Sequence, residues 1–290
     1  MVNLMERVLV YGMSNNQGGI ESYLLGISTK IKKQGIQFDF LSDFESIAYS
    51  DVLKENGSRL FFLPAKGKKL LQHLSSVRKL LIEHPEYKTV YFNVLDAGAV
   101  FTVFIPWIMG KKIVIHSHNG ATDKIFLHKI CRPFLNLMTH ERLACSKLAA
   151  EYMFGKGQQK RKPAIIIPNA INAERYYFNK KIRTNYRKRM GLEENFVICH
   201  VGRISEQKNP FRLIDIFDLL CKNEPKAKLL YVGTGELKGK IYEYVNTKDC
   251  AKNISFLGSR LAIPELMQAA DVFLLPSLYE GLPTVAIEAQ

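Results

Sequence analysis

The sequence predicts an α/β protein built from two doubly wound domains. Short β-branched or aromatic runs alternate with longer amphipathic segments along the whole chain. Such alternation is typical of β-α-β units, which form parallel sheets with helices on both faces. The polar, basic stretch "KGQQKRKP" and the Pro168-Asn169 turn interrupt it. We therefore place a first domain at residues 1–165 and a second at 166–290, with the boundary between about residues 160 and 175.

The predicted strands are "RVLVYG", "IQFDFL", "RLFFLP", "TVYFN", "KIVIHSH", "RLACS", "AIIIPN", "FVICHVG", "KLLYVG", "NISFLG" and "DVFLLP". Helices are expected at 20–33, 69–83, 210–221 and 284–290. The apolar run "AGAVFTVFIPWIMG" holds a proline and is too short to span a bilayer. A buried helix is its predicted structure, and contact with a membrane surface is the alternative.

Composition indicates a soluble globular protein, because 47% of the residues are apolar and 23% are charged. The five cysteines form no C-x-x-C pair, which is typical of reduced thiols in a cytosolic protein. They are Cys131, Cys145, Cys199, Cys221 and Cys250. No signal peptide is recognisable, since "MVNLMER" leads directly into a predicted strand. The expected location is cytoplasmic.

The net charge of +14 is concentrated in the first half of the chain. Residues 1–165 contain 23 Lys and Arg against 13 Asp and Glu. Such a surplus attracts nucleic acid, anionic lipid headgroups or diphosphate-linked substrates. No RNP-type aromatic pattern, zinc-finger spacing or helix-turn-helix signature is present, so a nucleic-acid partner is not expected.

Two motifs in the first half follow predicted strands. Gly18 and Gly19 precede a helix, where backbone N–H groups can approach an anion, although glycines there also serve as plain turn residues. His116 and His118 lie on one face of a strand end. Zinc is not expected, because no further ligands stand at suitable spacing. An imidazole there can hydrogen-bond a substrate hydroxyl or phosphate, and core packing is the alternative for His116.

In the second half, "HVGRISEQKNP" places Arg203 and Lys208 between a strand and a helix. Two cations in such a turn can converge on one diphosphate, and a pair of solvated surface charges is the alternative. The next strand ends in "VGTGEL", where Gly233 and Gly235 permit a tight turn near a ligand.

The segment "PSLYEGLPTVAIEAQ" combines carboxylates with a predicted anion site. Pro283 marks the start of a helix, so Gly281 and Leu282 offer N–H groups at its N-terminus. Glu280 stands just before that site, and Glu288 can reach back toward it. A carboxylate beside a phosphate is favourable only when it accepts hydrogen bonds from neutral donors. Sugar hydroxyls attached to a diphosphate meet both demands.

Together these residues resemble the retaining glycosyltransferases of family 4, which have the GT-B fold. The resemblance rests on E-x7-E from Glu280 to Glu288, on Arg203 and Lys208, on "GGIE", on "HSHN" ending at Asn119 and on "IPNAIN". It implies two Rossmann-like domains facing a cleft. Residues 1–165 would form the acceptor-side domain and residues 166–290 the nucleotide-sugar-binding domain.

The resemblance also implies roles for single residues. Glu288 would bind the ribose hydroxyls and Glu280 a hydroxyl of the donor sugar, while Arg203 and Lys208 neutralise the diphosphate. Other positions would line the two substrates: His118 near the donor sugar, Gly18 and Gly19 under the donor phosphates or the acceptor, Gly258 to Arg260 beside the base, and Gly281 and Leu282 at the diphosphate. Asn119 would be a further substrate-binding residue. No metal and no cofactor would be needed.

As a member of this family, the protein would transfer a hexose or N-acetylhexosamine from a nucleotide sugar, expected to be a UDP-sugar. The acceptor would be a hydroxyl of a glycan or of a polyprenyl-diphosphate-linked sugar. "IHSHN" and "RLACS" resemble bacterial enzymes for capsule, exopolysaccharide or O-antigen synthesis. A lipid-linked acceptor would suit the basic first half, and would place the protein at the inner face of the plasma membrane.

Two alternatives share the nucleotide site: a sugar-nucleotide epimerase of the GT-B fold and a non-catalytic nucleotide-sugar-binding module. Members of the family continue beyond the helix that begins at Pro283, with further strand-helix units. We therefore expect a second domain truncated at its C-terminus, with Glu288 on a frayed helix end and with impaired catalysis.

Overall fold

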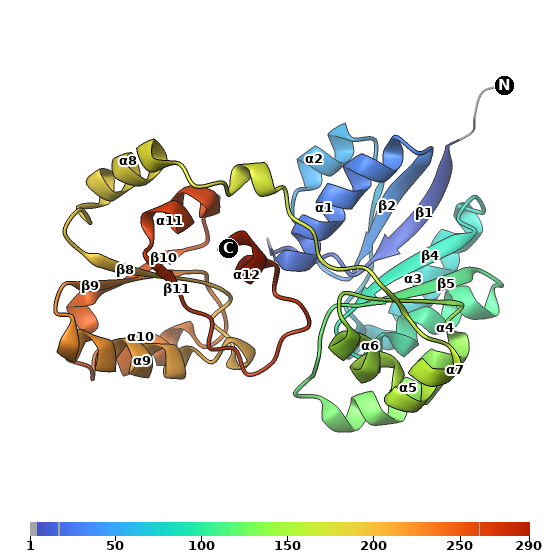
Figure 1. The fold of residues 1–290 in the computed structure, drawn as a ribbon. Helices are drawn as coiled ribbons and strands as arrows, with labels where there is room; N and C mark the ends of the chain where they lie inside the picture. Colours follow the sequence, from blue (N-terminus) through green and yellow to red (C-terminus); the bar gives the residue numbers. More distant parts are fainter. Residues whose placement is uncertain (1–4, 17, 261) are drawn as a thin grey trace. The chain divides into compact units, whose positions relative to one another are not determined.

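The computed structural model describes residues 5–16, 18–260 and 262–290, and it divides into two compact units (Figure 1). The first unit runs to Ala170 and also includes Glu280–Leu282. The second unit comprises Ile171–Tyr279 and Pro283–Gln290. The change of unit at Ala170 lies within the range of about 160 to 175 expected for the boundary, and the return of Glu280–Leu282 to the first unit was not expected from the sequence.

The first unit contains a seven-stranded sheet in which every pair of neighbouring strands is parallel. Its strands are β1 (Glu6–Tyr11), β2 (Ile36–Ser42), β3 (Leu60–Phe62), β4 (Thr89–Val94), β5 (Lys112–Ser117), β6 (Glu141–Ala144) and β7 (Ile165–Ile166). Their order is β3-β2-β1-β4-β5-β6-β7, so the direction of winding reverses between β1 and β4.

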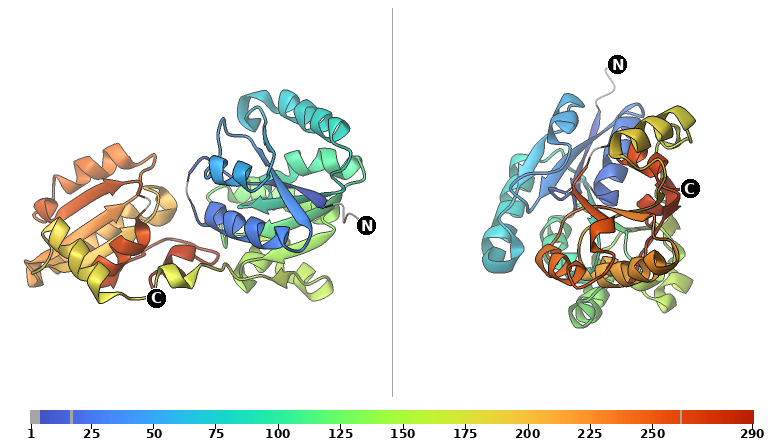
Figure 2. Two further views of the ribbon diagram at one scale, coloured as in Figure 1. Left: turned by 90° about the horizontal axis from the view of Figure 1, so that it is seen from above. Right: turned by 90° about the vertical axis from the view of Figure 1, so that its left-hand side faces the viewer.

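Helices cover both faces of this sheet (Figures 1 and 2). They are α1 (Gly19–Lys32), α2 (Ser50–Glu55), α3 (Lys66–Glu83), η1 (Ala97–Ala99), α4 (Val100–Ile108), α5 (Ile125–Met138), α6 (Lys147–Phe154) and α7 (Lys156–Arg161). The core on one face includes Tyr23 and Leu24 of α1. The core on the other face includes Val103 of α4 and Leu135 of α5.

The second unit contains a four-stranded parallel sheet of order β10-β9-β8-β11. Its elements are η2 (Ala173–Arg175), α8 (Lys180–Met190), β8 (Phe196–Val201), η3 (Glu206–Lys208), α9 (Pro210–Asn223), β9 (Ala227–Val232), α10 (Lys238–Val245), η4 (Ala251–Asn253), β10 (Ile254–Gly258), α11 (Ile263–Ala269), β11 (Val272–Phe273) and α12 (Thr284–Glu288). Two doubly wound parallel sheets confirm the predicted α/β class.

Two helix predictions need correction. The run 97–110 was expected to form a buried helix, but α4 buries only its inner side and leaves Phe101, Phe104 and Ile108 exposed. The helix expected at 284–290 ends at Glu288, with Pro283 as its N-cap residue. Local pattern predicts that a helix forms, whereas its neighbours decide which faces are covered.

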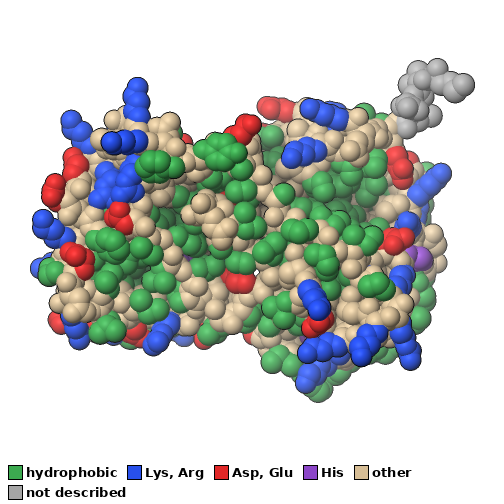
Figure 3. Space-filling model, viewed as in Figure 1, with side chains coloured by type: hydrophobic (Ala, Val, Ile, Leu, Met, Phe, Trp, Pro, Cys, Tyr) green, Lys and Arg blue, Asp and Glu red, His purple; other side chains and the backbone are tan. Residues whose placement is uncertain are grey.

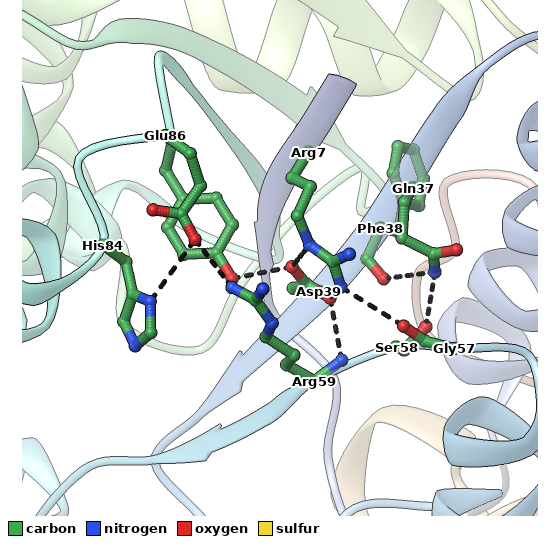
Figure 4. A network of polar contacts seen from close by, with 10 residues as sticks. Arg7, Gln37, Phe38, Asp39, Gly57, Ser58, Arg59, His84 and Glu86 are labelled. Carbon is green, nitrogen blue, oxygen red and sulfur yellow. Dashed lines mark hydrogen bonds and ion pairs between the residues drawn. The ribbon is translucent and has the colours of Figure 1, made fainter. Parts of the chain in front are cut away.

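A buried carboxylate joins the first strands of the first unit (Figure 4). Asp39 in β2 is fully buried and accepts two hydrogen bonds from the Arg7 guanidinium, at 2.6 and 2.7 Å. It also accepts the Tyr87 hydroxyl at 2.6 Å and the Arg59 amide at 2.7 Å. The carboxylate therefore has donors on both oxygens, as a buried charge requires.

Candidate functional site

The candidate site residues cluster where each sheet reverses its winding. In open α/β sheets, ligands bind outside the carboxyl ends of the strands at this switch point. In the first unit the switch lies between β1 and β4, and in the second it lies between β8 and β11.

Glu21 shapes the glycine-rich loop after β1. Its carboxylate is buried in the first turn of α1, and it accepts the Ser14 amide at 2.9 Å and the Ser14 hydroxyl at 2.7 Å. Gly18 lies directly beside it, because a Cβ added there would stand 2.6 Å from Glu21 Oε2. Gly18 is the N-cap residue of α1 and Gly19 its first residue. The "GGIE" sequence therefore fixes the loop against its own helix.

The two predicted histidines lie side by side at the end of β5. His116 is fully buried, and its Nδ1 lies 2.6 Å from the Tyr91 hydroxyl. Nε2 of His118 donates to Asn93 Oδ1 over 2.9 Å. The two imidazole rings are 4.1 Å apart, and Tyr23 contacts both edge-on. His116 is therefore a packed core residue, whereas His118 stands at the strand end.

Burial keeps both imidazoles neutral. It lowers the pKa of His116 to about 2, with the nearby His118 acting in the same direction. It lowers the pKa of His118 to about 4, although the neighbouring Asn169 side chain opposes this shift. Among the described residues, no hydrogen-bond partner reaches the buried His118 Nδ1 or the buried Asn169 Oδ1. Both atoms can accept hydrogen bonds from hydroxyl groups.

Acidification is expected to destabilise the first unit. The unfolded chain takes up protons on histidine below about pH 6.5, whereas folded His116 and His118 stay neutral to much lower pH. Stability should therefore be complete above that value and should fall as the pH drops from about 7 toward 5. Trp107, the single tryptophan, packs against the first unit's core and reports its unfolding in urea. A variant with glutamine at both histidines should show a weaker dependence of the unfolding midpoint on pH. A midpoint that stays constant from pH 7 to 5 in the unchanged protein would contradict the prediction.

The tripeptide Glu280–Leu282 packs against the segments that follow β5 and β6, within the first unit. The Ser146 hydroxyl donates to the Gly281 carbonyl at 2.9 Å, and Asn169 Nδ2 donates to the Leu282 carbonyl at 2.7 Å. Gly281 lies so close to the chain that a Cβ would stand 2.3 Å from the His118 carbonyl. Only glycine permits this approach, which brings Glu280 into the neighbourhood of His118 and Asn119.

In the second unit, the loops after β8 and β9 are in direct backbone contact. A Cβ at Gly233 would lie 2.0 Å from the Gly202 carbonyl, and one at Gly235 would lie 2.4 Å from the Ile204 carbonyl. The Ile204 amide donates to the Thr234 carbonyl at 3.1 Å. The structure therefore gives Gly233 and Gly235 a packing role that shapes the loop carrying Arg203.

The loop after β8 is also tied to the loop after β11. Gln207 Nε2 donates to the Tyr279 carbonyl at 3.1 Å. The backbone carbonyl of Gln207 accepts the Leu278 amide at 2.9 Å. Asn209, at φ 51°, donates from Nδ2 to the Pro276 carbonyl at 3.3 Å. These bonds join the two loops that flank the second switch point.

Two cations lie in the loop after β8, and a neutral histidine lies in β8 just before it. Arg203 is exposed and lies 3.9 Å from Glu236, while Lys208 is half-buried at the end of η3. His200 is fully buried, and its Nδ1–H donates to the Leu274 carbonyl at 2.8 Å. Burial lowers the pKa of His200 to about 4, and the charge of Lys208 contributes to this shift.

The remaining predicted residues lie in other segments of the second unit. Glu288 is half-buried at the end of α12. Burial raises the pKa of its carboxyl, while a hydrogen bond from Tyr176 and the charge of Arg175 oppose the rise. Arg260 is exposed, just after Gly258, whose carbonyl accepts the Gly233 amide at 2.9 Å. The roles of Glu288 and Arg260 remain predictions.

Several residues that build the site were not predicted from the sequence. Glu21, Asn93, Ser146, Gln207 and Asn209 fix loops or orient a ring. Glu21 stands within "GGIE", Ser146 ends "RLACS", and Gln207 and Asn209 stand within "HVGRISEQKNP", so these motifs offered a signal. Asn93 is a single polar residue at the end of the predicted strand "TVYFN".

No group of three or more His, Cys, Asp or Glu side chains in the described residues is placed to hold a metal ion. In the same residues, no helix combines the length and the apolar character needed to cross a bilayer. Metal independence stays a prediction.

Comparison with known proteins identifies relatives along nearly the whole chain. The family model "Glycosyl transferases group 1" matches residues 182–290. The putative glycosyltransferase EpsF of Bacillus subtilis is 30% identical over 98% of this chain and 77% of its own length. An Escherichia coli enzyme, UDP-Gal:alpha-D-GlcNAc-diphosphoundecaprenol alpha-1,3-galactosyltransferase, is 36% identical over 88% of this chain and 69% of its own length.

Solved structures show the same fold. HepE of Anabaena, crystallised with UDP and glucose, superposes with a TM-score of 0.80 at 20% identity, covering 98% of this chain and 78% of that chain. WaaG, a glycosyltransferase involved in lipopolysaccharide biosynthesis, superposes with a TM-score of 0.73 at 18% identity, covering 97% and 78%. These likenesses establish the GT-B architecture. With the identity to EpsF and to the E. coli enzyme, they show that the chain belongs to the glycosyl transferases of group 1.

Proposed function

We propose that the protein transfers a hexose or N-acetylhexosamine from a UDP-sugar, with retention, to a hydroxyl of a glycan or polyprenyl-diphosphate-linked acceptor. The observation that carries this proposal is the 30% identity to EpsF over 98% of the chain. The name of the E. coli relative supports a UDP-sugar donor and a lipid-diphosphate acceptor, and the UDP-glucose complex of HepE supports the same donor class. Assembly of a bacterial surface polysaccharide such as a capsule is the proposed setting.

The second unit supplies the groups for the leaving nucleotide. The bond from the anomeric carbon to the diphosphate breaks, and its electron pair leaves with the diphosphate oxygen. Arg203 and Lys208 would stabilise the charge that develops there. Glu288 would accept hydrogen bonds from the ribose hydroxyls.

The first unit supplies neutral acceptors. His118 Nδ1 and Asn169 Oδ1 suit hydroxyl groups of the donor sugar, and Glu280 would hold another. The acceptor oxygen then bonds to the anomeric carbon on the face that the diphosphate leaves, and its proton passes to a diphosphate oxygen. These steps require neither a metal nor a cofactor.

Donor class and reaction can be tested together. UDP-, GDP- and ADP-sugars should be compared by thermal shift, and we expect stabilisation by UDP-sugars alone. Incubation with a polyprenyl-diphosphate-linked sugar should then release UDP, and NMR of the product should show the donor's anomeric configuration. UDP release that does not depend on the acceptor would favour hydrolysis. Conversion of the sugar nucleotide without UDP release would favour the epimerase. Binding without turnover would favour the binding module.

Glu288→Ala is expected to weaken UDP-sugar binding. The variant removes a charged acceptor, and each hydrogen bond to such a group contributes about 1.5–3 kcal/mol. Calorimetric titration measures the change, with Glu243→Ala at an exposed position of α10 as the matched control. Equal affinity in Glu288→Ala and the unchanged protein would refute the ribose assignment.

A further inference from the structure

The outer sides of α4 and α5 form a continuous apolar surface on the first unit. The two helices pack against each other, and both expose large hydrophobic side chains. The α4–α5 face consists of Phe101, Phe104, Ile108, Ile125, Phe126, Ile130, Phe134 and Leu137. Phe126 is 79% exposed and Leu137 is 71% exposed. On α5, residues 126, 130, 134 and 137 recur at helical spacing and form one stripe.

This surface is not the core-facing side of α5. The inner side is already occupied by His128, Cys131, Leu135 and Met138, all buried. His128 accepts the Ala97 amide at 3.1 Å and donates to the Tyr152 carbonyl at 3.2 Å, which fixes the helix in its layer. A helix that is apolar on both sides is normally covered on both sides. Contiguous apolar patches of this kind mark interaction surfaces.

The charges around the α4–α5 face identify its partner. Between residues 97 and 138 stand the basic Lys111, Lys112, Lys124, Lys129 and Arg132, against one acidic residue, Asp123. Lys112 pairs with Glu141 at 3.2 Å, and the other four cations still outnumber Asp123. Neighbouring α7 carries Lys156, Lys160 and Arg161 and no acidic residue. Figure 3 shows basic and hydrophobic side chains together over this part of the first unit. A second copy of the chain would bring like charges together, whereas anionic lipid headgroups complement them.

We propose that the α4–α5 face docks on the surface of an anionic lipid bilayer. The apolar side chains enter the boundary between headgroups and acyl chains, and the lysines and arginines contact the headgroup phosphates. The chain connects this surface to the site, because α5 begins shortly after Asn119 and Gly120. A lipid-linked acceptor would thereby be presented to the first unit. That last step rests on the proposed function, whereas docking itself does not.

Vesicle binding without any sugar nucleotide tests the inference. The 290-residue chain should sediment with vesicles of phosphatidylcholine mixed with phosphatidylglycerol at low salt, and less so with phosphatidylcholine alone. At 1 M salt the Debye length falls to about 3 Å, so binding should weaken. Trp107 is half-buried on α4, with its ring 6.3 Å from that of Phe104 in the face, so its fluorescence should shift to the blue when the face enters the bilayer.

Substitutions on α5 locate the surface. Phe126→Asp, Phe134→Asp and Leu137→Asp together should weaken vesicle binding by at least about tenfold, since each places a charge in the bilayer boundary. The matched control is Leu71→Asp, Phe178→Asp and Leu219→Asp, which alters equally exposed side chains elsewhere. Both sets change exposed residues, and urea unfolding verifies that the fold is kept.

Three results would overturn the proposal. They are absence of binding by the unchanged chain at low salt, equal binding by the α5 variant, and equal loss in the control. If the unchanged chain does not bind vesicles but forms a dimer, and the α5 variant is monomeric, the face would be assigned to a second copy of the chain instead. Loss of docking with retained transfer to a short water-soluble acceptor would leave the proposed function standing, so the two can fail separately.

Discussion

Replacing Arg203 and Lys208 together by alanine is expected to lower sugar transfer by about 10²–10³-fold while leaving the fold intact. Arg203 is exposed and its ion pair with Glu236 spans 3.9 Å. Such surface pairs contribute at most about 1 kcal/mol, so the loss should appear in catalysis and not in stability. The physical reason is the negative charge that develops on the departing diphosphate. Cations already fixed in position stabilise this charge in the transition state, whereas water would first have to reorient.

The two single variants make the prediction sharper. If both cations hold one diphosphate, the double variant should cost less than the sum of the single losses. Lys240→Ala, at an exposed position of α10, removes one positive charge, as each single variant does, without touching the loop, and its activity should be unchanged. Initial rates with saturating donor and acceptor measure the effect. Strict additivity, or a double variant with nearly full activity, would show that these residues do not act on a common group.

Local pattern was sufficient to predict most of the fold. The predicted strands "TVYFN" and "KLLYVG" correspond to β4 and β9, and the helix predicted at 210–221 to α9. Runs of β-branched and aromatic residues between polar turns carry this information within a few neighbouring residues. The glycines and charged residues at the strand ends were predictable for the same reason, because their position follows from where each strand stops.

Contacts between distant residues were not predictable from the sequence. Asn93 reads as one polar residue in an apolar strand, yet it orients His118 from across the neighbouring strand. Glu280–Leu282 is held in the first unit by hydrogen bonds from Ser146 and Asn169, which lie more than a hundred positions away in the sequence. The exposed side of α4 was missed because the apolar run 97–110 predicts burial, whereas Phe101, Phe104 and Ile108 are exposed.

Asp39→Ala is expected to destabilise the first unit by about 3–5 kcal/mol, the largest stability effect that the structure indicates. The carboxylate is fully buried and receives four hydrogen bonds from Arg7, Tyr87 and the Arg59 amide. Alanine leaves these donors without an acceptor, and the Arg7 guanidinium without its counter-charge. The sequence "IQFDF" predicts a strand and gives no sign of this role.

The same network contains its own control (Figure 4). Arg59 and Glu86 form an ion pair of 2.6 Å whose side chains are 46% and 38% exposed. Glu86→Ala should therefore change the free energy of unfolding by no more than about 1 kcal/mol. The two variants remove carboxylates at similar distances from arginine, so the difference between them isolates the effect of burial.

Urea unfolding followed by Trp107 fluorescence measures both variants, because Trp107 packs in the first unit and reports that unit alone. Asp39→Asn keeps one oxygen acceptor and the shape of the side chain, and it should fall between the unchanged protein and Asp39→Ala. This intermediate variant keeps the prediction testable if the alanine variant does not fold. Equal midpoints for Asp39→Ala and Glu86→Ala would mean that the buried carboxylate contributes no more than a surface one. The close arrangement of β1, β2 and Tyr87 around it would then be held by apolar packing alone.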